Sequence, residues 1–311
     1  MVKDQILQID YSRICRKGCD TIFKANYHTH AKYCKHGEGE IQEYIDDAIK
    51  YGLEELGFTC HIPFSKEFIE SDYYKVIKDN ATNEKIIPGR ESRMDYYDLP
   101  NYLNDLKKAK ANNNLIKIYS GLECEYDEAN KEYVNEIKNN FDYLILGIHH
   151  VFKNGILYDF TKKYVVSKDG TRKMDYDDFD VYAENCVNGI RSGLFKYVAH
   201  PDFFMDKVEE FTSKCEEVSR RIIECAVENN IPLEINVSDF CKSEKKGRRL
   251  MYPRDEFWKN ASEYKDLKVI VGTDAHKPSR TCDFREKEVN ELVRKYQLNL
   301  LKKLKIEEYK I

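Results

Sequence analysis

Histidine gives the first chemical signal in this 311-residue sequence. The eight histidines fall in a few short groups, and each group follows an apolar run that is typical of a buried strand. Neutral imidazole is the commonest metal ligand in proteins, and a chain that used histidine as an ordinary surface residue would scatter it. The pattern therefore predicts a polynuclear metal site. The residues are His28, His30, His36, His61, His149, His150, His200 and His276.

Residue spacing within two groups favours shared ligation. His28 and His30 are two positions apart, so on an extended segment both rings point to one face and can share an ion. Asp274 and His276 repeat this spacing with a carboxylate and an imidazole. Three ions held in this way would be a strong electrophile for an anionic substrate.

Two pairs of neighbouring candidates require a choice. His149 and His150 point in opposite directions on a strand, and we choose His149 as the ligand. Glu123 and Glu125 share one face, and we choose Glu123, since its two oxygens could bridge two ions. Glu125 is then expected behind the ligands or towards solvent. A lone histidine such as His61 is more often a surface or core residue, but the complete set at strand ends favours a metal site.

The elements that must position these residues alternate between strand and helix. Strands are expected at 21–27, 56–60, 116–123, 143–148, 197–199, 232–237 and 267–272. Helices are expected near 41–49, 99–112, 129–139, 176–191, 212–229, 255–264 and 285–304. Residues 64–98 are expected to form a long loop and 152–174 an irregular insertion. About seven such units predict parallel strands wrapped by helices, with the candidate ligands at the strand ends that meet at one mouth.

Composition excludes several classes of function. Charged residues make up 34% and the net charge is −4, so a nucleic-acid partner is not expected. The N-terminus lacks a signal-peptide core, and no apolar window is long enough to span a membrane. The ten cysteines show no C-x-x-C pair, and we expect reduced thiols in a cytoplasmic protein whose partner is a small molecule.

An ordered set of motifs between residues 26 and 276 resembles the PHP (polymerase and histidinol phosphatase) superfamily. The motifs are N-Y-H-T-H (26–30), His36, G-F-T-C-H-I-P-F (57–64), G-L-E-C-E-Y (121–126), D-Y-L-I-L-G-I-H (142–149), V-A-H-P-D (198–202) and G-T-D-A-H (272–276). Within it, H-I-P-F, G-L-E-C-E-Y and residues 92–103 look like histidinol-phosphate phosphatase. The leading segment, residues 1–20, lies outside the match, and residues 21–311 are expected to form a single domain.

The resemblance implies an α/β fold, a distorted (β/α)7 barrel of the TIM type, with a trinuclear metal site at the C-terminal ends of its strands. Carried over by residue, His28, His30, Glu123 and Asp274 hold the first ion; Glu123, His149 and His200 hold the second; His36, His61 and His276 hold the third. The ions are zinc, manganese or iron, and mixed nitrogen and oxygen ligands do not choose among them.

The implied activity is metal-dependent hydrolysis of L-histidinol phosphate to L-histidinol and phosphate, in histidine biosynthesis. A metal-bound hydroxide held by Glu123, His149, His200 and Asp274 is expected to attack phosphorus in line. Relatives tend to carry an arginine near the place of Cys241, so other basic side chains must hold the phosphate here. The candidates are Arg93, Lys242, Arg248, Arg249 and Arg280.

Two other functions stay open at this point. A phosphoesterase of the same superfamily could act on nucleotides or other small phosphomonoesters. The fold could also be a non-catalytic metal-binding module, although an inactive relative is expected to have lost ligands. The oligomeric state is not indicated by the sequence.

Overall fold

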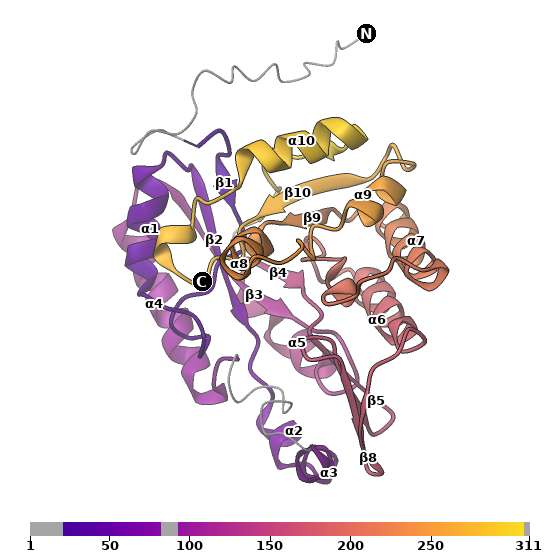
Figure 1. Cartoon of the computed structure of the whole chain (residues 1–311). Helices are drawn as coiled ribbons and strands as arrows, with labels where there is room; N and C mark the ends of the chain where they lie inside the picture. The colour runs from indigo at the N-terminus through magenta and orange to yellow at the C-terminus, as the bar shows by residue number, and fades with distance from the viewer. Residues whose placement is uncertain (1–20, 82–92, 308–311) are drawn as a thin grey trace.

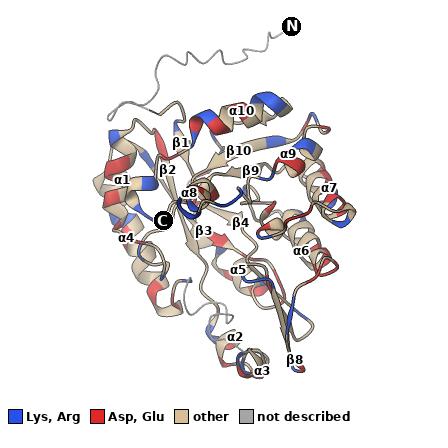
Figure 2. Ribbon diagram, in the orientation of Figure 1, with Lys and Arg blue, Asp and Glu red and all other residues tan. Residues whose placement is uncertain are grey.

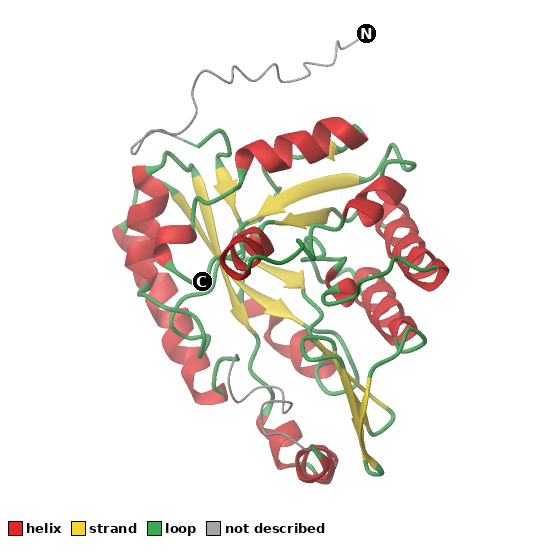
Figure 3. Ribbon diagram, in the orientation of Figure 1, coloured by secondary structure: helices red, strands yellow, loops and turns green. Residues whose placement is uncertain are grey.

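Parallel strands form the centre of the protein, and helices surround them (Figures 1 and 3). The computed structural model describes residues 21–81 and 93–307, so the extension predicted at residues 1–20 lies outside it. One parallel sheet has the order β1-β2-β3-β4 and a second has the order β11-β10-β9. The strands are β1 (Ala25–Asn26), β2 (Glu55–His61), β3 (Lys117–Cys124), β4 (Tyr143–Leu146), β9 (Leu233–Asn236), β10 (Lys268–Gly272) and β11 (Asn299–Leu300).

Single parallel bridges connect the margins of these two sheets. Val198 pairs with Leu146, the last residue of β4, and with Leu233 of β9, so the segment around Val198 takes the place of the short strand expected at 197–199. At the other margin, Thr29 pairs with Ala275. The parallel strands therefore curl round a common interior, and their C-terminal ends face the same side.

Helices cover the outside of the curled sheets (Figure 3). Helix α1 shows why they form: Ile41, Tyr44, Ile45 and Ala48 lie on one buried face, and Glu43 accepts a hydrogen bond from the Glu40 backbone at 2.6 Å. The outer helices are α1 (Ile41–Lys50), α4 (Leu99–Asn112), α5 (Lys131–Ile137), α6 (Phe179–Arg191), α7 (Ser213–Glu228), α9 (Asp255–Ala261) and α10 (Glu286–Tyr296). Acidic and basic residues are interspersed along them (Figure 2).

Tyrosine side chains fill the end of the interior opposite the strand C-termini. Tyr143 and Tyr197 each donate a hydrogen bond to the backbone carbonyl of Tyr27, at 2.7 and 3.1 Å. These residues belong to a buried cluster that is separate from the core between sheet and helices. The cluster contains Ala25, Tyr27, Tyr119, Tyr143, Ile145, Tyr197, Ala199, Ile270 and Ile306.

A smaller unit projects from the curled sheets where loops were expected. Its antiparallel sheet comprises β5 (His150–Lys153), β6 (Ile156–Asp159), β7 (Tyr164–Ser167) and β8 (Gly170–Lys173). Helices α2 (Lys66–Glu70) and α3 (Asp72–Asn80) lie with it in Figure 1 and share its core. That core contains Phe64, Phe68, Ile77, Phe152, Leu157 and Val166. The expectation of an irregular insertion at 152–174 and a continuous loop at 64–98 was therefore wrong.

Local signals for this unit were present in the sequence. Asn154 and Gly155 both have positive φ, 52° and 77°, as a tight hairpin turn requires. Ser65 and Ser71 cap α2 and α3 by accepting hydrogen bonds from Phe68 and Tyr74 backbone nitrogens. Each helix is short, so the apolar period that marks longer helices does not develop.

Two further elements differ from the expected ones. Between the strand expected at 232–237 and the helix expected near 255–264, where no helix was expected, the chain forms helix α8 (Ser238–Lys246), which ends at Gly247 in the left-handed conformation. The last helix, expected to reach 304, ends at Tyr296, because Gln297 adopts a left-handed φ of 51° and β11 follows. Within residues 21–81 and 93–307, the helices are all too short or too polar to cross a bilayer.

Candidate metal centre

The nine predicted ligands lie together at the C-terminal ends of the parallel strands. His61 ends β2 and Glu123 lies in β3, while the others follow β1, β4, the Val198 segment and β10. Their donor atoms form overlapping groups within 4.8 Å of one another. These groups include His28, Glu123 and His200; His28, His30 and Asp274; His61, Glu123 and His149; and His36, His61 and His276.

Glu123 occupies the middle of this arrangement, and its two oxygens face different imidazoles. Oε2 lies 3.4 Å from His28 Nε2, 3.4 Å from His30 Nε2 and 3.0 Å from His61 Nδ1. Oε1 lies 2.8 Å from His200 Nε2 and 3.9 Å from His149 Nε2. A carboxylate placed in this way can serve two cations at once.

Asp274 forms a second focus of donors. Its Oδ1 lies 3.6 Å from His28 Nε2, 3.3 Å from His30 Nε2 and 3.3 Å from His276 Nδ1. The ring of His276 lies 4.2 Å from that of His36, which brings the more exposed end of the site together.

Several buried donor atoms have no hydrogen-bond partner. They include His28 Nε2, His30 Nε2, Glu123 Oε2 and His276 Nε2. Buried polar atoms are costly to leave unsatisfied, so their concentration here needs a physical cause. Two ligands bound to one ion at about 2.1 Å in tetrahedral geometry lie roughly 3.4 Å apart. Separations of 3.3–3.6 Å around His28, His30 and Asp274 match that spacing. The donor set therefore fits divalent cations.

Burial keeps several imidazoles in the form that binds metal. It lowers the pKa of His276 to about 3 and also lowers the pKa values of His61 and His149. Burial raises the pKa of Glu123, but His61 and His28 hold it well below its usual range. Neutral imidazoles beside an ionised carboxylate are the protonation states that ligation requires.

Glu234 of β9 is a functional residue that sequence reasoning missed. Its Oε1 lies 2.7 Å from His28 Nδ1, and its Oε2 accepts hydrogen bonds from the His200 backbone nitrogen and Asn236 Nδ2 at 3.0 and 2.9 Å. A carboxylate in this place orients the ring and leaves Nε2 for the metal. Its signal was an acidic residue inside a short strand, all four residues of which, Glu234 included, are buried.

Two glycines make room for these carboxylates. A Cβ at Gly147 would lie 2.0 Å from Glu123 Oε1, and a Cβ at Gly272 would lie 1.8 Å from Glu234 Oε1. Two ligand positions also hold unusual backbone conformations, with φ of 30° at His200 and 48° at Asp274. Such strain concentrates at functional sites that the surrounding fold holds in place.

The structure separates the neighbouring candidates in both pairs. His149 faces Glu123, whereas His150 lies 3.6 Å from Asp159 and 3.9 Å from Glu125. Glu125 is buried and paired with Arg93, and its Oε1 lies 3.4 Å from His149 Nδ1. Glu125 therefore lies behind a candidate ligand, and it does not face solvent.

Two of the five basic candidates lie close to the site. Arg93 is buried against Glu125 and stacks over the Phe64 ring at 4.5 Å. Lys242 donates to the Tyr252 hydroxyl at 3.2 Å. That hydroxyl lies 3.3 Å from Ser238 Oγ, which in turn donates to an Asp274 oxygen at 3.0 Å.

The other three basic candidates have carboxylate partners of their own. Arg248 forms a bidentate pair with Asp239 at 2.5 and 3.1 Å. Arg249 lies 3.4 Å from Glu256 and Arg280 lies 3.3 Å from Asp283. Their role in phosphate binding stays a prediction.

Comparison with known sequences identifies the family of the chain. Residues 26–238 match the family described as PHP domain. The chain belongs to this family. Among PHP relatives, the histidinol-phosphatase of Lactococcus lactis is 26% identical over 222 residues, which cover 70% of this chain and 72% of that protein. The histidinol-phosphatase of Bacillus subtilis is 22% identical over 272 residues, covering 81% and 93%.

A solved PHP structure has a similar fold. The histidinol phosphate phosphatase of Lactococcus lactis, complexed with zinc, L-histidinol and phosphate, matches with a TM-score of 0.61 and 21% identity. The match covers 91% of this chain and 98% of that one. The PHP fold therefore extends over nearly all of the chain.

Proposed function

We propose that this PHP protein is a metal-dependent phosphomonoesterase that hydrolyses L-histidinol phosphate to L-histidinol and phosphate. The observation that carries the proposal is the placement of Glu123, whose two oxygens face two different sets of imidazoles. The relatives named histidinol-phosphatase, and the neighbour that binds zinc, L-histidinol and phosphate, support the choice of substrate.

We further propose that the curled sheets close into a (β/α)7 barrel that holds three divalent ions. The bridges of Val198 with Leu146 and Leu233, and of Thr29 with Ala275, support closure. His28, His30, Glu123 and Asp274 would hold the first ion, and Glu123, His149 and His200 the second. His36, His61 and His276 would hold the third. When bound, the ions supply neutralising charge for the phosphoryl oxygens and activate water.

The side chains of this protein then bind and orient the phosphate. Lys242 brings an ammonium towards Asp274 through Tyr252 and Ser238, and it can pair with a phosphoryl oxygen. Arg93 brings a second cation, but the Glu125 carboxylate already pairs with it. We therefore assign the direct phosphate contact to Lys242 and expect Arg93 to fix Glu125.

Acidic and aromatic groups nearby suit the amine and imidazole of the alcohol product. Burial raises the pKa of Asp202 to about 6, and its Oδ1 has no hydrogen-bond partner. The Phe203 ring lies 5.4 Å from His149 and 5.2 Å from His200 and offers an aromatic face beside the ligands. A cationic leaving group would be stabilised here by charge and by contact with the ring.

Phosphate release from L-histidinol phosphate tests the proposal. Protein loaded in turn with zinc, manganese or iron should release phosphate, and protein treated with a chelator should not. A panel of nucleoside monophosphates and simple sugar phosphates serves as the comparison. Equal rates across the panel would show that the enzyme has broad specificity for phosphomonoesters. No phosphate release with any metal would favour a non-catalytic metal-binding module.

A further inference from the structure

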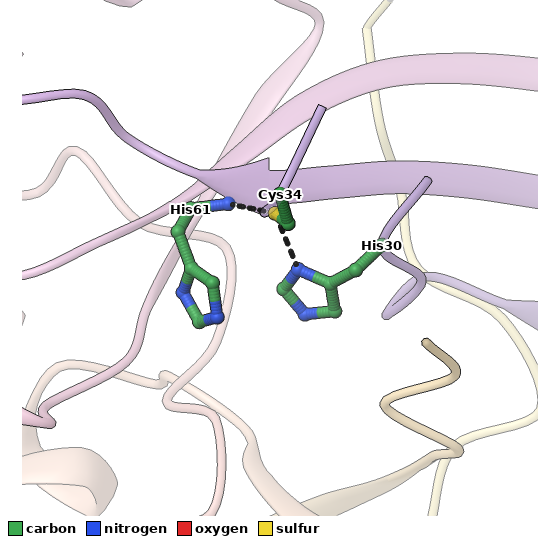
Figure 4. Close-up of side chains that lie close together, drawn as sticks. All are labelled: His30, Cys34 and His61. Atoms are coloured by element: carbon green, nitrogen blue, oxygen red, sulfur yellow. Dashed lines mark hydrogen bonds between the residues drawn. The ribbon is translucent and has the colours of Figure 1, made fainter. Parts of the chain in front are cut away.

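A thiol lies behind the metal-facing edge of His30 (Figure 4). Cys34 Sγ is 3.4 Å from His30 Nδ1 and accepts a hydrogen bond from the His61 backbone nitrogen at 3.1 Å. Cys34 and His30 are fully buried, and His61 is nearly so. One sulfur therefore contacts two candidate ligands, which come from the segment after β1 and from the end of β2.

The two ring nitrogens of His30 have separate surroundings. Nε2 lies 3.4 Å from Glu123 Oε2 and 3.3 Å from Asp274 Oδ1, and it has no hydrogen-bond partner. An imidazole that offers Nε2 to a cation carries its proton on Nδ1, so this N–H donates to Cys34 Sγ. Because the nitrogens point to opposite sides of the ring, the sulfur does not share the ion that Nε2 would hold.

We propose that Cys34 is a positioning residue for the metal centre, which fixes the tautomer of His30 and the placement of His61. The inference rests on the proposed metal function and adds to it. Ligand histidines generally donate their second N–H to a carboxylate, a carbonyl or water. Glu234 does this for His28 at 2.7 Å, whereas a thiol, a weaker acceptor, does it for His30.

The proposal also explains how two ion groups are held in register. His30 belongs to the group with His28 and Asp274, and His61 belongs to the group with His36 and His276. The rings of His30 and His61 lie 4.5 Å apart, and Cys34 is hydrogen-bonded to both residues. Loss of the sulfur is therefore expected to weaken both groups.

Metal affinity of the complete chain provides the test. Zinc and cobalt titrations against a competing chelator, without substrate, should show about tenfold weaker binding in Cys34→Ala, the lower end of the usual effect of such partners. Cys34→Ser keeps an acceptor and should recover part of the affinity. Cys215→Ala is the matched control, because Cys215 is also fully buried but lies in α7, where its Sγ accepts a hydrogen bond from Thr212 Oγ1 at 3.5 Å.

Three results would overturn the proposal. One is equal affinity in Cys34→Ala and Cys215→Ala. Another is a sulfur-to-cobalt charge-transfer band in the native protein that disappears in Cys34→Ser, since this would make Cys34 a ligand. The third is a native protein that binds no metal. Tight metal binding with the expected ranking, but no release of phosphate from L-histidinol phosphate, would defeat only the proposed substrate.

Discussion

At the scale of single residues, the candidate metal centre depends on carboxylates surrounded by imidazoles. Glu123 touches five histidines across its two oxygens, and Glu234 supports two of them from behind. Each carboxylate thus positions more than one histidine. Substitution at these positions should affect metal content before it affects the fold.

Glu123→Gln should remove the negative charge of the proposed bridge while it preserves the shape of the side chain. We expect loss of bound metal and a fall in kcat on the order of a thousandfold, which corresponds to about 4 kcal/mol. Metal analysis of the purified variant, together with phosphate release, measures both effects. Glu38→Gln alters an exposed acid, 62% accessible, that pairs with Lys277 and should keep native values. Full metal content in Glu123→Gln would contradict the bridging role.

Gly147→Ala tests the space that Glu123 needs. A Cβ at 2.0 Å from Glu123 Oε1 must push the carboxylate away, at a cost of about 1–3 kcal/mol in stability together with weaker metal binding. Gly193→Ala is a useful contrast: its φ of 70° strains an alanine, but nothing lies within 4 Å of the added atom. It should lose stability and keep metal affinity, as measured by denaturant unfolding and chelator competition. Unchanged affinity in Gly147→Ala would count against the crowding argument.

At the scale of elements, the positions of the ligands follow from strand ends, and these could be predicted. The runs before His61, Glu123 and His149 are short and mostly apolar, so their C-terminal ends were identifiable. The unit of α2, α3 and β5–β8 was not predicted, because its core joins Phe64 and Phe68 to Phe152 across a long stretch of sequence. Glu234 was missed for a related reason, since its partner His28 is 206 positions away.

Asp127 follows β3 and contacts the unit of α2, α3 and β5–β8 through the Phe152 backbone. We expect it to give the stability of the protein a measurable pH dependence. It is buried and accepts hydrogen bonds from the Phe152 and Ala129 backbone nitrogens at 2.8 and 3.0 Å. Burial raises its pKa to about 7. The folded carboxyl therefore binds its proton more tightly than the unfolded one, and its contribution to stability is complete below about pH 4 and is lost as the pH rises through 7.

Asp127→Asn should remove this dependence. The difference in unfolding free energy between native protein and variant should change by up to about 4 kcal/mol between pH 4 and pH 7, with the native protein losing stability. Urea unfolding at a series of pH values, with equal metal loading, isolates the effect. Parallel pH curves for the two proteins would show that Asp127 titrates normally.

At the scale of the whole molecule, metal ions should connect the two parallel sheets. The candidate ligand groups draw on residues at or after the ends of β1, β2, β3 and β4 from one sheet and after β10 from the other. Short segments connect these sheets at their margins: the Val198 segment forms backbone hydrogen bonds with β4 and β9, and the backbones of His28 and His30 form them with Ala275. Ligands on both sides make bound ions part of the stability of the fold.

Removal of metal should therefore lower the melting temperature. One site occupied at a hundred times its Kd contributes roughly 2.7 kcal/mol, which corresponds to a shift of about 4 °C for a domain of this size. Thermal unfolding with and without a chelator, followed by addition of zinc or manganese, measures the shift and its recovery. The same melting temperature in both conditions would show that the sheets hold together without ions.

The tyrosines at the far end of the interior have a consequence for substrate entry and product release. Tyr143 and Tyr197 both hydrogen-bond to the Tyr27 carbonyl and plug that end with side chains. Substrate and both products are therefore expected to pass through the mouth at the strand ends. Because the freed alcohol and the inorganic anion would leave by the route that the next substrate takes, accumulated product should slow turnover.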